Sequence, residues 1–133
     1  MDQSEKPIPD AVDQFLAQYV NSIEYLEILL LLADDAERHF TAEEVAQKIY
    51  AVPVSATRRL EKIVADRLAE RTEESTKRYR FAPVDQKLRS LVAQVAKTYR
   101  ERRVAVITLI ASRPMENVRA FSDAFRLGKK DKP

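Results

Sequence analysis

Basic side chains gather in residues 52–83, which read VPVSATRRLEKIVADRLAERTEESTKRYRFAP. Arg58 and Arg59 stand near the start of a segment with helical spacing of apolar residues, and a second basic group follows at residues 77–80. An arginine guanidinium can donate two parallel hydrogen bonds to guanine, and lysine and arginine both bind phosphate. The stretch therefore has two interpretations: an element that binds nucleic acid, or an ordinary helix and hairpin whose charged face is solvated.

The helical segment supplies most of the candidate contacts. Its spacing predicts that Thr57, Leu60 and Ile63 face the core. The residues expected to face outward are candidate DNA contacts. Arg58 and Arg59 could contact bases, Ser55 a base edge, Ala56 a thymine methyl group and Lys62 a phosphate.

Beyond this helix, four more basic residues are candidates for phosphate or minor-groove contacts: Arg67, Lys77, Arg78 and Arg80. The alternative for Arg58 and Arg59 is an ion pair with Glu61, Glu70 or another carboxylate of the chain. Such pairs would leave the same residues as a solvated surface.

Other chemistry has little support in the residue types. The single glycine, Gly128, excludes a phosphate-binding loop and a dinucleotide fingerprint. One histidine, His39, and no cysteine exclude a zinc constellation, so His39 is either a packing residue or a pH-sensitive contact. The adjacent acids at 34–35 and 43–44 suit helix ends rather than catalysis. We expect neither an enzyme nor a cofactor or metal site.

Composition indicates one soluble domain of 133 residues, 45% hydrophobic and 33% charged. The longest apolar run, ILLLLA at 28–33, is too short to cross a bilayer, and no secretion signal precedes it. With no cysteine and no such signal, the expected location is the cytoplasm.

Charge is distributed unevenly along the chain. Residues 1–52 carry 3 Lys and Arg against 11 Asp and Glu, whereas residues 53–83 carry 8 against 5 and residues 84–133 carry 12 against 5. Such asymmetry indicates an electrostatic partner such as nucleic acid, or halves that face each other within the fold or a dimer.

Helical periodicity predicts the elements that position these residues. Residues 1–21 form a loose arm and a helix, and Ser22 caps a second, more buried helix. After a short strand at 39–40, Thr41 and Glu44 form a T-x-x-E capping box for a helix over 41–49. Pro53 then opens the helix 53–66. A strand, turn and strand over 68–82 form a hairpin.

The C-terminal part is predicted to be helical and to mediate dimerisation. An apolar stripe runs along one long helix over 85–112, which begins at Asp85 and is long for so small a domain. A second subunit is the economical partner for this stripe. A further helix is expected over 115–127, within a dimerisation region 84–127. Residues 128–133 form a basic disordered tail.

The order of elements resembles the winged helix-turn-helix superfamily, and within it the MarR-type dimeric bacterial regulators. The resemblance covers residues 22–83 and rests on FTAEEVAQKI (40–49) and SATRRLEKIVADRLAER (55–71). Arg67 stands where the family commonly has a glycine in a left-handed conformation, so its Cβ is expected to reshape the exit from the helix. The hairpin also lacks glycine at its tip, and the region beyond Pro83 matches no family.

The expected fold is therefore mostly α with a small β-hairpin wing, followed by long C-terminal helices. The resemblance implies a homodimeric, sequence-specific transcriptional regulator bound to double-stranded DNA. The helix 53–66 would enter the major groove, and the hairpin 68–82 would touch flanking backbone. The alternative is a winged-helix adaptor that binds another protein and not DNA. A small-molecule effector between the wing and the long helices is compatible with either.

Overall fold

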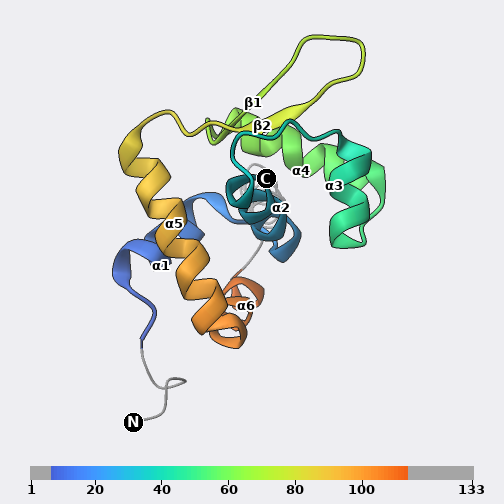
Figure 1. The fold of residues 1–133 in the computed structure, drawn as a ribbon. Helices are drawn as coiled ribbons and strands as arrows, with labels where there is room; N and C mark the ends of the chain where they lie inside the picture. Colours follow the sequence, from blue (N-terminus) through green and yellow to red (C-terminus); the bar gives the residue numbers. More distant parts are fainter. Residues whose placement is uncertain (1–6, 114–133) are drawn as a thin grey trace, which may run out of the picture.

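The computed structural model describes residues 7–113, and the region 115–127 and the tail 128–133 lie outside the described residues. Helices and one hairpin make up the described chain (Figure 1). The elements are α1 Asp10–Tyr19, α2 Ile23–Asp34, α3 Ala42–Ile49, α4 Pro53–Ala65, β1 Ala69–Arg71, β2 Tyr79–Phe81, α5 Gln86–Glu101 and α6 Arg103–Ser112. The expected architecture, mostly helical with a small β-hairpin, is confirmed.

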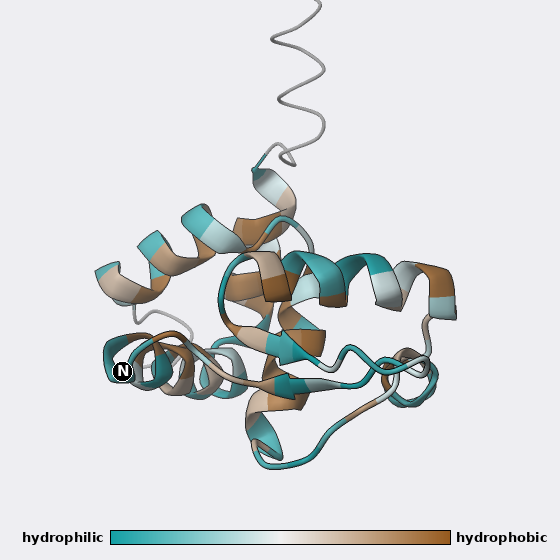
Figure 2. Cartoon of the chain, turned by 90° about the horizontal axis from the view of Figure 1, so that it is seen from above, coloured by the Kyte–Doolittle hydropathy of each residue, from teal (hydrophilic) through white to brown (hydrophobic). Residues whose placement is uncertain are grey.

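Helix α2 lies at the centre of the core. Ser22 caps it as expected, because its Oγ accepts a hydrogen bond from the Tyr25 N–H at 3.0 Å. Its buried side chains, Tyr25 and the leucines and isoleucine that follow, pack against α3, α4, α5 and β2. In Figure 2 apolar positions concentrate in the middle of the molecule, and outer helix turns are more hydrophilic.

The segment from α3 to α4 is a helix-turn-helix. The capping box is confirmed: the Glu44 N–H donates to Thr41 Oγ1 at 3.1 Å, and the Thr41 N–H donates to Glu44 Oε1 at 2.8 Å. Helix α3 ends at Ile49, and the next residue, Tyr50, caps it with a left-handed backbone of φ 59°. Pro53 then opens α4 at a position where its missing N–H breaks no helical bond.

The inward side of α4 differs from the expectation at two residues. Ala56 is fully buried with Leu60 and Ile63, whereas Thr57 is exposed. The buried stripe therefore follows spacings of four and three from Ala56, and Thr57, one residue further on, turns outward. The outward placement of Ala56 was wrong.

The exit from α4 is a Schellman-type turn. Arg67 has φ 64°, so it adopts the left-handed conformation that glycine favours despite its Cβ, and the expected reshaping of the exit was wrong. Its N–H donates to the Val64 carbonyl at 3.0 Å, and the Leu68 N–H donates to the Ile63 carbonyl at 3.1 Å. This turn directs the chain from the helix into the hairpin.

The hairpin pairs Ala69 with Phe81 and Arg71 with Tyr79 in antiparallel register. Phe40 adds a single bridge to Tyr79, with both backbone bonds at 2.8 Å, where a short strand was expected. The hairpin and the two helices α3 and α4 lie at the same end of the molecule (Figure 1).

The long helix expected over 85–112 is two helices. Arg102, with φ −132° and ψ 47°, interrupts it between α5 and α6. The break lets α6 turn back against α2, so Val106 and Ile110 are buried in the same core as Val92 and Val95 of α5. Core burial within one chain thus overrides the continuous helical pattern of the sequence.

Candidate nucleic-acid interface

The outward face of α4 carries one arginine without an intramolecular partner. Arg58 is exposed and makes no hydrogen bond or ion pair with another residue of 7–113. Thr57 and Val54 are exposed beside it. This face is therefore open to a partner, with the Arg58 guanidinium available to donate.

Arg59 and Ser55, in contrast, bond to Glu24 at the start of α2. Arg59 Nε lies 3.0 Å from Glu24 Oε1, and the Ser55 hydroxyl donates to the same oxygen. Arg59 therefore pairs with a carboxylate, as the alternative interpretation allowed. Its Nη1 and Nη2 have no bonding partner in residues 7–113 and are not buried. The outer edge of this guanidinium is still able to donate.

Lys62, in the last turn of α4, forms an ion pair with Asp66. Its Nζ lies 2.8 Å from Asp66 Oδ2 and 5.6 Å from the centre of the Tyr25 ring. The Tyr25 hydroxyl donates to the same carboxylate oxygen at 2.6 Å. Burial, and then the bond to Asp66, raise the pKa of Tyr25 well above its ordinary value. Tyr25 therefore stays protonated and fixes Asp66 beside Lys62.

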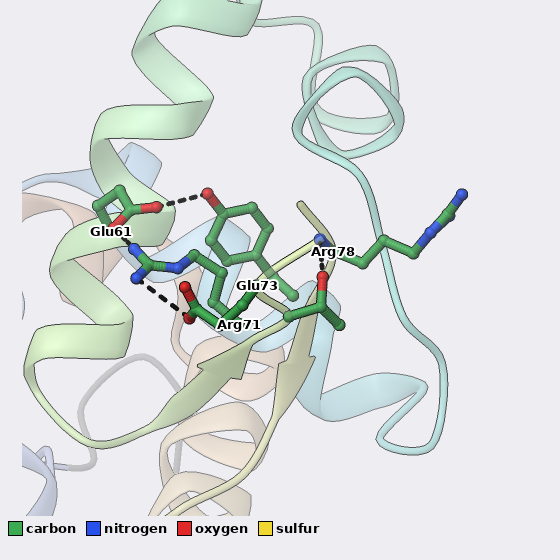
Figure 3. A network of polar contacts seen from close by, with 6 residues as sticks. Glu61, Arg71, Glu73 and Arg78 are labelled. Atoms are coloured by element: carbon green, nitrogen blue, oxygen red, sulfur yellow. Dashed lines mark hydrogen bonds and ion pairs between the residues drawn. The ribbon is translucent and has the colours of Figure 1, made fainter. Parts of the chain in front are cut away.

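A network on Glu61 ties α4 to the hairpin (Figure 3). Glu61 Oε1 accepts from Arg71 Nη1, and Oε2 accepts from the Tyr79 hydroxyl at 2.6 Å. Arg71 Nη2 also lies 3.4 Å from Glu73 Oε2. Burial and the bond to Glu61 raise the pKa of Tyr79, so its hydroxyl remains a donor. No sequence pattern predicted this network, since Glu61 was considered only as a partner of Arg58 or Arg59.

The basic residues of the hairpin divide into paired and unpaired groups. Arg80 bonds to Glu70, its cross-strand neighbour, and lies 4.0 Å from Glu37. Lys77 and Arg78 are exposed, and their side chains have no partner in the part of the chain that the structure describes. In Figure 3 the Arg78 side chain points away from the Glu61 network.

The nine candidate residues therefore fall into three groups. Ala56 is buried and does not reach the surface. Ser55, Arg59, Lys62 and Arg80 lie near the surface but bond to carboxylates. The exposed residues whose side chains have no partner within 7–113 are Arg58, Arg67, Lys77 and Arg78.

A groove lies between α2 and α5. It encloses about 630 Å³ and has an apolar floor that includes Leu30, Leu31 and Val92. Arg89 covers the Phe81 ring at one end, at 5.2 Å from the ring centre, and Arg103 lies 3.4 Å from Glu27 at the other. This groove lies where a small-molecule site was considered from the sequence.

Residues 7–113 include no group of three or more His, Cys, Asp or Glu side chains arranged to hold a metal ion. In the same range, no single helix is both long and apolar enough to cross a membrane. Only α1 and α2 together reach that length and composition, and they are bent by 112°.

The arrangement of helices and hairpin is similar to that of known transcriptional regulators. A mutant of MepR from Staphylococcus aureus, bound to an oligodeoxyribonucleotide, matches with a TM-score of 0.53 and 16% identity over 91% of this chain and 87% of that one. The regulator MosR from Mycobacterium tuberculosis matches with a TM-score of 0.50 and 22% identity over 90% and 83%. No protein-family profile and no curated protein matches the sequence. The chain has the winged helix-turn-helix fold of the MarR-type regulators.

Proposed function

We propose that the protein is a sequence-specific, DNA-binding transcriptional regulator that acts as a homodimer. Helix α4 enters the major groove, and the hairpin, residues 68–82, lies on the flanking backbone. The observation that carries the proposal is a set of exposed cations that have no side-chain partner within residues 7–113: Arg58 on α4, with Lys77 and Arg78 on the hairpin at the same end of the molecule (Figure 1). The similarity to MepR, which has been captured with an oligodeoxyribonucleotide, supports it.

The residues contribute unequally in this proposal. Arg58 contacts a base, because its guanidinium is exposed and unpaired among residues 7–113. Arg67, Lys77 and Arg78 bind phosphates or enter the minor groove. Arg59, Ser55, Lys62 and Arg80 are secondary contacts, since their carboxylate partners already satisfy part of their bonding. Ala56 takes no part.

Dimerisation is proposed through the segment 85–112. Leu88 and Leu91 of α5 and Ile107 and Leu109 of α6 are only partly buried within the chain. Val104 of α6 is 77% exposed. A second copy packed on these side chains would bury them and would present two recognition helices to successive major grooves.

Fluorescence anisotropy against a mixed-sequence duplex tests the proposal. Affinity is expected to fall by at least about tenfold between about 50 and about 200 mM salt, because each phosphate contact releases counterions. Arg58→Ala should then weaken binding to a selected site by about five- to a hundredfold and relax specificity at one base pair. Lys97→Ala, an exposed lysine of α5, is the matched control. Unchanged affinity and specificity in Arg58→Ala would contradict the mechanism.

The adaptor function has one observation in its favour, the apolar groove between α2 and α5. A protein segment that filled this groove would bind mainly through apolar contacts. Its affinity would respond little to salt, in contrast to DNA binding. Absence of duplex binding even at the lower salt would therefore favour the adaptor.

A further inference from the structure

The turn before α4 and the first turn of this helix expose three large apolar side chains. Tyr50 is 97% exposed, Val52 64% and Val54 71%. These three residues, here called the turn patch, are three of the five large hydrophobic residues that are exposed within 7–113. Exposed apolar side chains clustered in this way indicate a surface that is covered by a partner.

Tyr50 adds a conformational argument. Its left-handed backbone, with φ 59°, is a conformation that glycine adopts without steric penalty and tyrosine does not. Its ring is almost fully exposed, so it makes no packing contact that would offset this penalty within the chain. The left-handed backbone closes the C-terminal cap of α3, in which the Ala51 N–H donates to the Ala46 carbonyl at 2.9 Å, so it is the exposed ring, and not the backbone, that points to a contact outside the fold.

The patch adjoins the unpaired arginine of α4. Val54 and Arg58 are four residues apart on one helix, which places their Cβ atoms about 6 Å apart on the same face. The first turn of α4 holds no acidic residue of its own. The nearby Glu24 carboxylate already accepts from Ser55 and Arg59, and Glu43 and Glu44 of α3 lie beside Pro53, so Arg58 is the group here that attracts an anionic partner. An occupant of this surface must therefore offer both an anionic surface and apolar groups.

We infer that the turn patch reads thymine methyl groups in the major groove, with Val54 as a specificity-determining residue. The thymine methyl is the one apolar group that bases present in that groove, and duplex DNA supplies the anionic surface. Since successive base pairs are about 3.4 Å apart, the thymine lies one or two base pairs from the guanine bound by Arg58. This inference rests on the proposed function, and it gives Val54 the methyl contact that buried Ala56 does not make.

Thymine-to-deoxyuridine exchange tests it, because the exchange removes only the methyl group. A preferred site is first obtained by selection from random duplexes with the full chain. Each thymine near the guanine is then replaced in turn, and binding is measured by anisotropy. The wild type should lose about fourfold in affinity at one such position, the worth of one buried methyl. Val54→Ser should bind the thymine and deoxyuridine duplexes equally.

Two further variants separate recognition from folding. Tyr50→Gly should raise the melting temperature, because it relieves the left-handed strain, while it weakens DNA binding several-fold. Val84→Ser is the matched control, since Val84 is also exposed, at 56%, and lies near the C-terminal end of α4. Its backbone N–H donates to the Arg67 carbonyl there. Val84→Ser should keep the wild-type preference for thymine.

The outcomes distinguish this inference from the proposed function. Two results overturn the inference and leave DNA binding intact. One is a selected site without a thymine near the guanine, and the other is a loss of affinity on deoxyuridine exchange that persists in Val54→Ser. A wild-type chain that binds no duplex overturns both. Loss of the methyl effect in Val54→Ser alone, with Val84→Ser unchanged, supports the assignment.

Discussion

At the scale of single residues, Arg67 holds the exit of α4 in a conformation that favours glycine. Its φ of 64° places the side chain against its own backbone. Arg67→Gly is expected to raise the free energy of unfolding by about 0.5 to 1 kcal/mol, measured by urea denaturation. Lys97→Gly, in the exposed interior of α5, should lower it by a similar amount. A loss of stability in Arg67→Gly would mean that its side chain contributes more than the strain removes.

Glu44 gives a residue-scale prediction for pH. The hydrogen bond from the Thr41 N–H lowers the pKa of Glu44 below its ordinary value, and Arg38 adds to this. Because the folded-state pKa lies below the unfolded one, this stabilisation is present at neutral pH and is lost as the pH falls through the folded-state pKa.

Melting temperatures between about pH 7 and about pH 3 measure this contribution. Glu44→Gln is expected to lose less melting temperature than the wild type over that range, since it no longer takes up a proton there. Glu43→Gln, one residue away in the same turn, is the control, because the Glu43 side chain makes no hydrogen bond with residues 7–113. Equal slopes for Glu44→Gln and the wild type would contradict the role of the capping box.

At the scale of elements, the Glu61 network determines how the hairpin sits on α4. Each Glu61 oxygen accepts one of these bonds, and glutamine offers a single acceptor oxygen and no charge, so Glu61→Gln leaves Arg71 or the Tyr79 hydroxyl without its acceptor on the helix. Glu61→Gln and Tyr79→Phe are expected to speed amide exchange at Thr72, whose N–H donates to the Arg78 carbonyl at 2.9 Å, by roughly tenfold.

The amide of Leu68, in the turn that ends α4, should be unaffected and serves as an internal control. Glu73→Gln is the control variant, since Glu73 is exposed and reaches Arg71 only at 3.4 Å. Exchange at Thr72 that is as slow in Tyr79→Phe as in the wild type would show that strand pairing alone holds the hairpin.

Sequence patterns predicted those elements that depend on local signals. The Ser22 cap and the Thr41–Glu44 capping box follow from neighbouring residues, and both are present. The break at Arg102 has no such signal, because it arises from the burial of α6 against α2. Local periodicity does not predict helix boundaries that depend on tertiary packing.

The candidate interface was predictable in outline but not in its pairing. Basic residues at helical and hairpin positions were visible in the sequence, whereas Glu24 is 35 positions from Arg59 and only the fold brings them together. Ala56 was misplaced because a small residue at one helical position fits either side of the helix. The left-handed backbone of Tyr50 was not predicted either, because this conformation is not typical of tyrosine.

At the scale of the whole molecule, the apolar stripe of α5 and α6 is only partly buried within the chain. Val92, Val95 and Val106 are buried within the chain, so part of the stripe needs no second subunit. Leu88, Leu91 and Ile107 remain partly exposed. The proposed dimer therefore rests on a narrower surface than the full stripe, and its strength depends on few side chains.

Val104 tests that dimer, because it is 77% exposed on α6 and contributes little to the core of one chain. A buried, unpaired carboxylate at an apolar interface is strongly unfavourable, so Val104→Glu is expected to be monomeric by light scattering where the wild type is dimeric. Val84→Glu should stay dimeric, as Val84 lies outside the segment 85–112. Because two linked recognition helices bind far more tightly than one, DNA affinity should fall by at least about tenfold in Val104→Glu only. A monomeric wild type would contradict the dimer, and a dimeric Val104→Glu would place the dimer contact on another surface.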